Sequence, residues 1–310
     1  MKIGIVGSGK RVKEMYLPVL DSFGDRVELV AVSNRSGKND LGRDIKNYTS
    51  IPEMAKEVDL IINVVPPAAS YSVAFDSIKT GKKVLLETPC PERFARDNSL
   101  VELSKDSSVG VVEQWPFLPL ECFKRELIKS GLIGEVQVVE NDYRTFLYHG
   151  VAQIRKYLPR GTRVIEDSIP RANITFTVEG GKLDPWCLRF LAFTNGSIGI
   201  FKYSDQHKRV DFRGDRGLRV YGSKGSIVGD CLVGGKNLYI AYVEDGKTEY
   251  LDVKFEEDRI VSDKATWVYP VKGLDEHQIG IYQHIEAIID GSPLYSIEEA
   301  YADMGVIHGI

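Results

Sequence analysis

A glycine turn close to the N-terminus offers the first residues that could do chemistry. It follows an apolar run at residues 3–6, which predicts a buried parallel strand, and it opens a helix-like stretch from about residue 10 to residue 23. The turn comprises Gly7, Ser8, Gly9, Lys10, Arg11 and Val12. Gly7 permits a tight turn, and Gly9 lets a phosphate group approach the N–H groups at the start of a helix. The pattern predicts dinucleotide binding; a tight strand-to-helix turn without nucleotide is the alternative.

A second apolar run, residues 28–33, ends in a loop that can discriminate between nicotinamide cofactors. The loop carries Asn34, Arg35, Ser36 and Lys38. A carboxylate at this place would accept hydrogen bonds from both ribose hydroxyls and favour NAD. An amide, a guanidinium and a hydroxyl suit a 2′-phosphate instead, because arginine can bind phosphate through two hydrogen bonds. We therefore expect NADP(H) to be favoured, with NAD(H) possible; the alternative is a solvated basic loop.

His149 is the best candidate for a proton carrier. Histidine is the usual general acid or base of enzymes, and its imidazole can exchange a proton with a substrate hydroxyl during hydride transfer. Tyr148, Tyr143 and Arg144 lie close in sequence and can donate hydrogen bonds to a substrate. The alternative is a histidine that caps or fills the start of a helix.

Other aromatic and titratable residues have structural explanations beside functional ones. Trp115 can pack against a sugar ring or the nicotinamide, or it can lie in an interdomain core. His277 and His284 are seven residues apart, and no acid or cysteine accompanies them as a ligand set. We interpret both histidines as structural or exposed and predict no metal site.

The scaffold that must position these residues is predicted by alternating strands and helices. Apolar runs at residues 3–6, 28–33, 59–65, 83–87 and 110–113 are separated by helical spacing. This order favours right-handed crossovers and a doubly wound parallel sheet, the Rossmann type of α/β fold. Ligands bind beyond the carboxyl ends of such strands. Those ends carry Gly7, Asn34, Pro66, Glu87, Thr88, Gln114 and Trp115.

The pattern changes after residue 119. One more helix is predicted at residues 120–130, and from residue 134 onward β-type runs dominate, several of them separated by glycine turns. Two helical stretches close the chain, at residues 276–289 and 296–309. We expect a dinucleotide-binding domain at 1–119 and, at 120–310, a substrate-binding α+β domain with an open, mostly antiparallel sheet.

Composition excludes several classes of partner. The 310 residues are 43% hydrophobic and 27% charged with a net charge of −4, so nothing favours nucleic acid or an anionic membrane. The longest apolar stretches are too short to span a bilayer. A strand is predicted directly after Met1, so we expect no signal peptide. The four cysteines are widely spaced, as free thiols are. We expect a soluble cytoplasmic protein with a small-molecule substrate.

Several segments resemble the glucose–fructose oxidoreductase, inositol dehydrogenase and MocA-like family. Besides the glycine turn, these are residues 59–67, similar to a strand that ends in a proline under the nicotinamide, and residues 81–89, similar to the family's G-K-x-V-x-x-E-K-P signature. Residues 220–226 and the closing helices are also similar, so the resemblance covers nearly the whole chain.

The resemblance implies an NAD(P)-dependent oxidoreductase that acts on a sugar, a polyol or a related carbonyl compound. It also implies a homodimer or homotetramer assembled through the open sheet. The expected cofactor site comprises Gly7, Ser8, Gly9, Lys10, Arg11, Val12, Asn34, Arg35, Ser36, Val65, Pro66, Pro67, Glu87, Thr88 and Gln114.

Two positions depart from the family's pattern. Thr88 stands where the family has a lysine between nicotinamide and substrate; threonine can donate a hydrogen bond but is uncharged and no base near neutral pH. Thr145 stands four residues before His149, where an aspartate is common. We expect His149 to carry the proton, with Tyr148 or Thr88 as auxiliary donors. The alternatives are a nucleotide-binding sensor without catalysis and a reductase of a non-sugar substrate.

Overall fold

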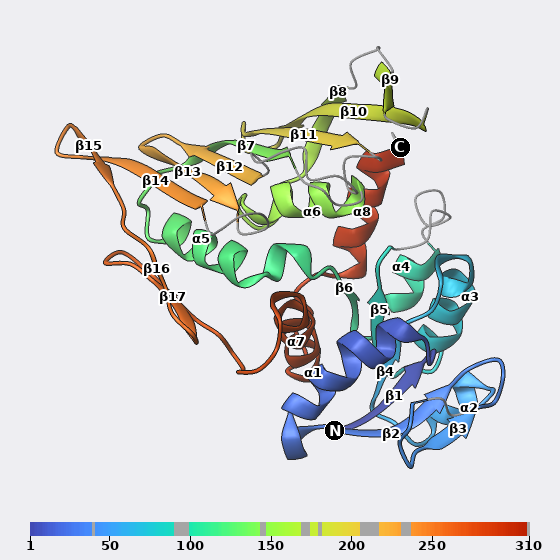
Figure 1. The fold of residues 1–310 in the computed structure, drawn as a ribbon. Helices are drawn as coiled ribbons and strands as arrows, with labels where there is room; N and C mark the ends of the chain where they lie inside the picture. The colour runs from blue at the N-terminus through green and yellow to red at the C-terminus, as the bar shows by residue number, and fades with distance from the viewer. Residues whose placement is uncertain are drawn as a thin grey trace. The chain divides into compact units, whose positions relative to one another are not determined.

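The computed structural model describes residues 1–38, 41–89, 99–142, 147–168, 174–178, 182–204, 217–230 and 237–308. The chain divides into two compact units, each built around its own sheet (Figure 1). The first unit comprises Met1–Leu118 and Pro270–His308, and the second comprises Pro119–Tyr269.

The first unit contains a six-stranded sheet in which every neighbouring pair is parallel, in the order β3-β2-β1-β4-β5-β6. The strands are β1 (Lys2–Val6), β2 (Glu28–Ser33), β3 (Lys46–Tyr48), β4 (Leu60–Asn63), β5 (Lys83–Glu87) and β6 (Val109–Val112). The predicted doubly wound parallel sheet is thus confirmed. β3 was not among the five predicted strands, because it is three residues long and none of them is buried.

Burial explains why the central strands are readable from sequence. All residues of β4 and β6 are buried, and so are all residues of β1 after Lys2. Strands covered by helices on both faces need apolar side chains on both faces, so they appear as continuous apolar runs.

The helices of the first unit are α1 (Leu17–Ser22), α2 (Ile51–Ala55), α3 (Pro67–Ile78), α4 (Ser99–Ser104), α7 (Glu276–Ile289) and α8 (Ile297–His308). Short 3-10 turns occur at Gly24–Arg26 and Trp115–Phe117. A π-helical turn, Val12–Tyr16, precedes α1, and in it the N–H of Leu17 donates to the carbonyl of Val12 five residues earlier. Such turns are rare and frequently lie at functional sites.

The closing helices α7 and α8 belong to the first unit, which differs from the expected second domain of residues 120–310. Ile281, Ile285 and Ile288 of α7 are fully buried in one hydrophobic cluster with Ile3 and Ile5 of β1. Their spacing of four and three residues places them on one face of the helix. That apolar face covers the parallel sheet, so the end of the chain completes the first unit.

The second unit contains a nine-stranded sheet in the order β15-β14-β13-β12-β7-β11-β10-β8, with β9 paired to β10. Its strands are β7 (Val136–Asp142), β8 (Val164–Ser168), β9 (Ile174–Val178), β10 (Lys182–Phe193), β11 (Ile198–Ser204), β12 (Gly217–Gly222), β13 (Gly225–Asp230), β14 (Asn237–Glu244) and β15 (Lys247–Tyr250). Among the described strand pairs of this sheet, β7–β11 alone is parallel, which confirms the mostly antiparallel sheet. A small sheet follows, formed by β16 (Lys254–Phe255), β17 (Arg259–Val261) and β18 (Thr266–Val268).

One face of the large sheet is covered by helices (Figure 1), namely α5 (Pro119–Lys129) and α6 (Leu147–Lys156). α6 lies very close to β11, because a Cβ at Gly150 would overlap the ring of Phe201. No helix in the described part of the chain is long and apolar enough to cross a bilayer.

Candidate nucleotide-binding site

The backbone geometry of the turn after β1 explains why it contains glycine. Gly7 follows β1 with φ at +109°, and its N–H donates to the carbonyl of Ser33 at 2.8 Å. A Cβ at Gly7 would overlap the carbonyl oxygen of Val64, so only glycine fits there. Gly9 differs, since no heavy atom lies within 4 Å of its added Cβ. The space beside Gly9 is open, and its carbonyl accepts from the N–H of Val12 at 3.1 Å as the helix begins.

The loop after β2 is tied back to this turn by Asn34. The amide nitrogen of Asn34 donates to Ser8 Oγ at 3.3 Å and to the carbonyl of Lys38 at 2.7 Å. Its amide oxygen accepts from Ser36 Oγ at 2.9 Å, and Ser36 Oγ accepts from the N–H of Lys38 at 3.3 Å. The amide thus shapes the loop, while the cations of Arg35 and Lys38 are exposed at its tip.

The next strand end carries prolines. β4 ends at Asn63. The N–H of Val64, the next residue, still donates a hydrogen bond to the carbonyl of Val6 in β1 at 2.9 Å. Val65 is half-buried and Pro66 exposed, and Pro67 is the first residue of α3. The position of proline at the start of a helix costs no hydrogen bond, because that N–H has no partner within a helix.

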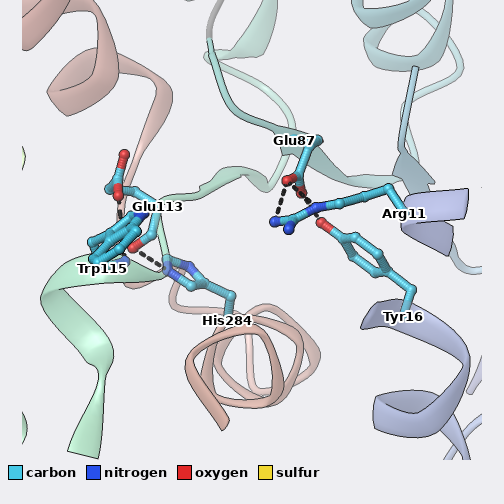
Figure 2. A network of polar contacts seen from close by, with 6 residues as sticks. All are labelled: Arg11, Tyr16, Glu87, Glu113, Trp115 and His284. Carbon is cyan, nitrogen blue, oxygen red and sulfur yellow. Dashed lines mark hydrogen bonds and ion pairs between the residues drawn. The ribbon is translucent and has the colours of Figure 1, made fainter. Parts of the chain in front are cut away.

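The carboxylate of Glu87, at the end of β5, holds two side chains from the helix after the glycine turn (Figure 2). Oε1 accepts from Arg11 Nε at 2.8 Å, and Oε2 accepts from the hydroxyl of Tyr16. Burial is the main cause that raises the pKa of Tyr16 well above its ordinary value, and the charge of Glu87 raises it further. The phenol therefore stays protonated. Thr88, the next residue in the chain, is half-buried.

The end of β6 contributes a buried polar group. Gln114 is 5% exposed, and its Oε1 has no hydrogen-bond partner among the described residues. Its neighbour Glu113 is 1% exposed; the carbonyl of Glu113 bonds Nε2 of His284 at 3.0 Å, and its carboxylate accepts from the N–H of Trp115 at 3.4 Å (Figure 2). A buried acceptor without a donor, at a carboxyl strand end, is a place for a ligand amide.

Both histidines of α7 pack against aromatic rings of the first unit. His284 is 1% exposed and packs edge-on against Phe117 with ring centres 4.8 Å apart. His277 packs edge-on against Trp115 at 4.7 Å, so the Trp115 ring contacts a side chain of its own unit. Within the described ranges no group of three or more His, Cys, Asp or Glu side chains could hold a metal ion.

The predicted proton carrier lies in the second unit. His149 is on α6 and only 5% exposed. The residue after His149, Gly150, accepts a hydrogen bond through its carbonyl from the amide nitrogen of Asn141 at 3.0 Å. The same nitrogen donates to Gln153 Oε1 at 3.0 Å. These two bonds join α6 to β7.

Several predicted substrate-site residues remain untested. The backbone of Tyr148 belongs to α6, but its side chain lies outside the described residues, as do Tyr143, Arg144 and Thr145. Thr88 belongs to the first unit and His149 to the second, so their meeting in one site stays a prediction.

The strand order makes neighbours of the predicted cofactor residues. β2, β1, β4, β5 and β6 are consecutive in the sheet, and their carboxyl ends carry Asn34, Gly7, Pro66, Glu87 and Gln114. Sequence reasoning missed Tyr16. Tyr16 stands five residues after Arg11, and this spacing indicates a shared helix face only if the helix contains a π-helical turn.

Comparison with known families bears on the first unit directly. Residues 1–114 match the GFO_IDH_MocA sequence family, described as an oxidoreductase family with an NAD-binding Rossmann fold. The resemblance seen in the sequence motifs is thereby confirmed for this part of the chain. An uncharacterized protein of Saccharomyces cerevisiae is 28% identical over 143 residues, which are 42% of this chain and 41% of that protein. The chain thus aligns with less than half the length of this relative.

Solved structures extend the likeness in fold to both units. A levoglucosan dehydrogenase in complex with NADH aligns with a TM-score of 0.69 at 13% identity, covering 99% of this chain and 96% of that chain. A UDP-N-acetylglucosamine 3-dehydrogenase from Acidithiobacillus ferrooxidans aligns with a TM-score of 0.68 at 14% identity, covering 100% and 95%. At these identities the likeness is one of fold.

Proposed function

Because residues 1–114 match the model of an oxidoreductase family with an NAD-binding Rossmann fold, we propose that this protein transfers a hydride between a nicotinamide dinucleotide and a small organic substrate. The observation that carries the proposal is the glycine turn: Gly7 can be no other residue, and Gly9 leaves open space beside the start of a helix. A diphosphate fits that space and the dipole of the helix.

The residues at the strand ends fit the rest of such a cofactor. The carboxamide of a nicotinamide is a hydrogen-bond donor, and the buried Oε1 of Gln114 is an acceptor that lacks one among the described residues. The loop of Asn34, Arg35 and Ser36 would hold the adenosine ribose. The cofactor supplies the hydride chemistry, while the protein binds it, orients it and provides the proton.

We favour NADP(H) over NAD(H). The loop tip presents Arg35 and Lys38 to solvent, whereas Asn34, the residue in the ribose-reading position, is neutral. Two cations attract a 2′-phosphate, and arginine can bind it through two hydrogen bonds. A titration with NADPH and NADH by nicotinamide fluorescence tests this, and Arg35→Ala should weaken NADPH far more than NADH. Equal affinities before and after the change would refute the preference.

A sugar, polyol or related carbonyl compound is the substrate class we propose. Two structural neighbours are named as dehydrogenases of levoglucosan and of UDP-N-acetylglucosamine. His149 is our candidate for the proton carrier, assisted by Tyr148 or Thr88. A screen of sugars and polyols for change in the reduced-nicotinamide absorbance tests the class. If a substrate is found, His149→Ala should lower kcat more than it raises KM.

A nucleotide-binding sensor without turnover is the second candidate. It is favoured by one observation: the described carboxyl edge offers the half-buried hydroxyl of Thr88 at the place where a lysine would act. Tight NADPH binding without turnover across the screen would support the sensor, or a reductase of a non-sugar substrate. Failure to bind either nucleotide would refute all of these functions.

We propose that the second unit forms a homodimer or homotetramer through the open face of its sheet. The strand registers place exposed Phe190, Ile198, Tyr221 and Tyr239 on the face opposite α6. Exposed apolar and aromatic side chains in one surface are typical of protein interfaces. Light scattering on the wild type and on Ile198→Glu measures the assembly; a wild-type monomer would refute it.

A cytoplasmic location is our expectation from the buried free thiol of Cys122.

A further inference from the structure

One carboxylate links the helix that follows the glycine turn to the carboxyl end of β5 (Figure 2). Glu87 Oε1 accepts from Arg11 Nε at 2.8 Å and lies 2.6 Å from Arg11 Nη2, while Oε2 accepts from the hydroxyl of Tyr16. Arg11 lies in the helix that follows β1, whereas Glu87 ends β5, which is separated from β1 by β4. The contact therefore crosses the carboxyl ends of the strands on which a dinucleotide would lie.

The π-helical turn is what allows both side chains to reach Glu87. Arg11 and Tyr16 are five residues apart, and in an α-helix such residues point about 140° away from each other. In a π-helical turn, hydrogen bonds join residues five apart, so these residues lie on the same face. The turn spans Val12–Tyr16 and its closing bond joins Val12 to Leu17. The unusual backbone thus directs an arginine and a tyrosine at one carboxylate.

The three side chains differ in exposure. Tyr16 is fully buried, the side chain of Glu87 is 11% exposed and that of Arg11 is 38% exposed. A buried tyrosine cannot touch a bound cofactor, but a ligand can reach the arginine. Burial and the neighbouring carboxylate keep the pKa of Tyr16 well above its ordinary value, so its hydroxyl is a donor throughout the neutral range.

We propose that Tyr16 and Glu87 are positioning residues that hold the Arg11 guanidinium in place to bind the diphosphate of the nicotinamide cofactor. This inference rests on the proposed function. An arginine that is already fixed by a carboxylate loses less side-chain freedom when a phosphate arrives. Glu87 also offsets the charge of Arg11 before the cofactor binds, and the planar guanidinium can bond a carboxylate and a phosphate at once.

ADP-ribose is the probe that isolates this interaction, because it carries adenosine and the diphosphate without the nicotinamide. Calorimetric titration of the whole protein should show binding at least about tenfold weaker for Arg11→Ala and about three- to tenfold weaker for Tyr16→Phe and Glu87→Gln. The matched control is Tyr282→Phe. Tyr282 belongs to the same hydrophobic cluster as Tyr16 and donates to Glu286 at 3.3 Å, so its loss also removes a tyrosine–glutamate bond. We expect Tyr282→Phe to bind ADP-ribose as the wild type does.

A double-variant comparison separates positioning from structural support. Tyr16→Phe should weaken ADP-ribose binding in the wild type and cause no further loss in Arg11→Ala, while its effect on Tm persists in both. The inference is overturned if Tyr16→Phe binds as Tyr282→Phe does, or if it weakens binding equally in both backgrounds. A wild type that binds neither ADP-ribose nor NADPH overturns the proposed function itself, which distinguishes the two failures.

Discussion

The two glycines of the turn after β1 allow the nucleotide site to be tested apart from the fold. Gly7 has φ at +109°, and a Cβ there would overlap the Val64 carbonyl oxygen and lie 3.1 Å from its carbon. Gly9 has no left-handed φ, and nothing lies within 4 Å of its added Cβ. Gly7→Ala should therefore damage the first unit, whereas Gly9→Ala should leave it intact and obstruct only a ligand.

The expected magnitudes follow from these geometries. A non-glycine residue in the backbone region of Gly7 costs about 1–3 kcal/mol. Overlap with a packed neighbour adds about 1–3 kcal/mol, for a total near 4 kcal/mol. In a unit of this size that loss lowers Tm by about 8–16 °C. For Gly9→Ala we expect a destabilisation of no more than about 1 kcal/mol, since Gly9 lies just before the helix and its added Cβ meets no atom. Its methyl group fills the space of the diphosphate, so affinity should fall at least about tenfold, or 1.4 kcal/mol.

Thermal unfolding and NADPH titration on both variants measure these effects. Gly9→Ser serves as a second blocking substitution of different polarity and should also bind weakly while remaining folded. A Gly9→Ala protein that binds NADPH and NADH as tightly as the wild type would show that no phosphate approaches this turn. A Gly7→Ala protein with unchanged Tm would refute the steric argument at the strand end.

Three further changes test the second unit. Lys124 is fully buried and its Nζ bonds Glu121 Oε1 at 3.1 Å, so Lys124→Met should destabilise by about 3–5 kcal/mol in urea unfolding. Adding Glu121→Leu should recover part of that loss; no recovery would contradict the buried ion pair. Burial opposes ionisation of Glu140, but its cationic neighbours outweigh it and lower its pKa, so its stabilisation is present above the unfolded pKa and is lost at lower pH. The stability gap between wild type and Glu140→Gln should then shrink below about pH 4.3, and a constant gap would exclude this explanation. Gly150→Ala should lower Tm because its Cβ would overlap Phe201, and an unchanged Tm would mean that α6 can shift.

Sequence patterns alone located most elements of the first unit. β2 and β5 have the predicted bounds of residues 28–33 and 83–87, and α7 has the predicted bounds of residues 276–289. These elements were readable because buried parallel strands are apolar on both faces and because α7 carries an apolar stripe. β3 was missed since its three residues make no apolar run. β8 was missed as well, because none of its residues is buried.

The sequence by itself also located the glycine turn and the polar loop after β2. Both depend on which residues stand at a few consecutive positions, because backbone conformation and side-chain charge are set there locally. Only the tertiary structure decided which unit α7 joins, since a helix stripe does not say which sheet it will cover. Only the structure brought Tyr16 to Glu87, 71 residues away. That contact depends on strand order and on a π-helical turn, and both are set by packing between segments distant in the chain rather than by the neighbours of either residue.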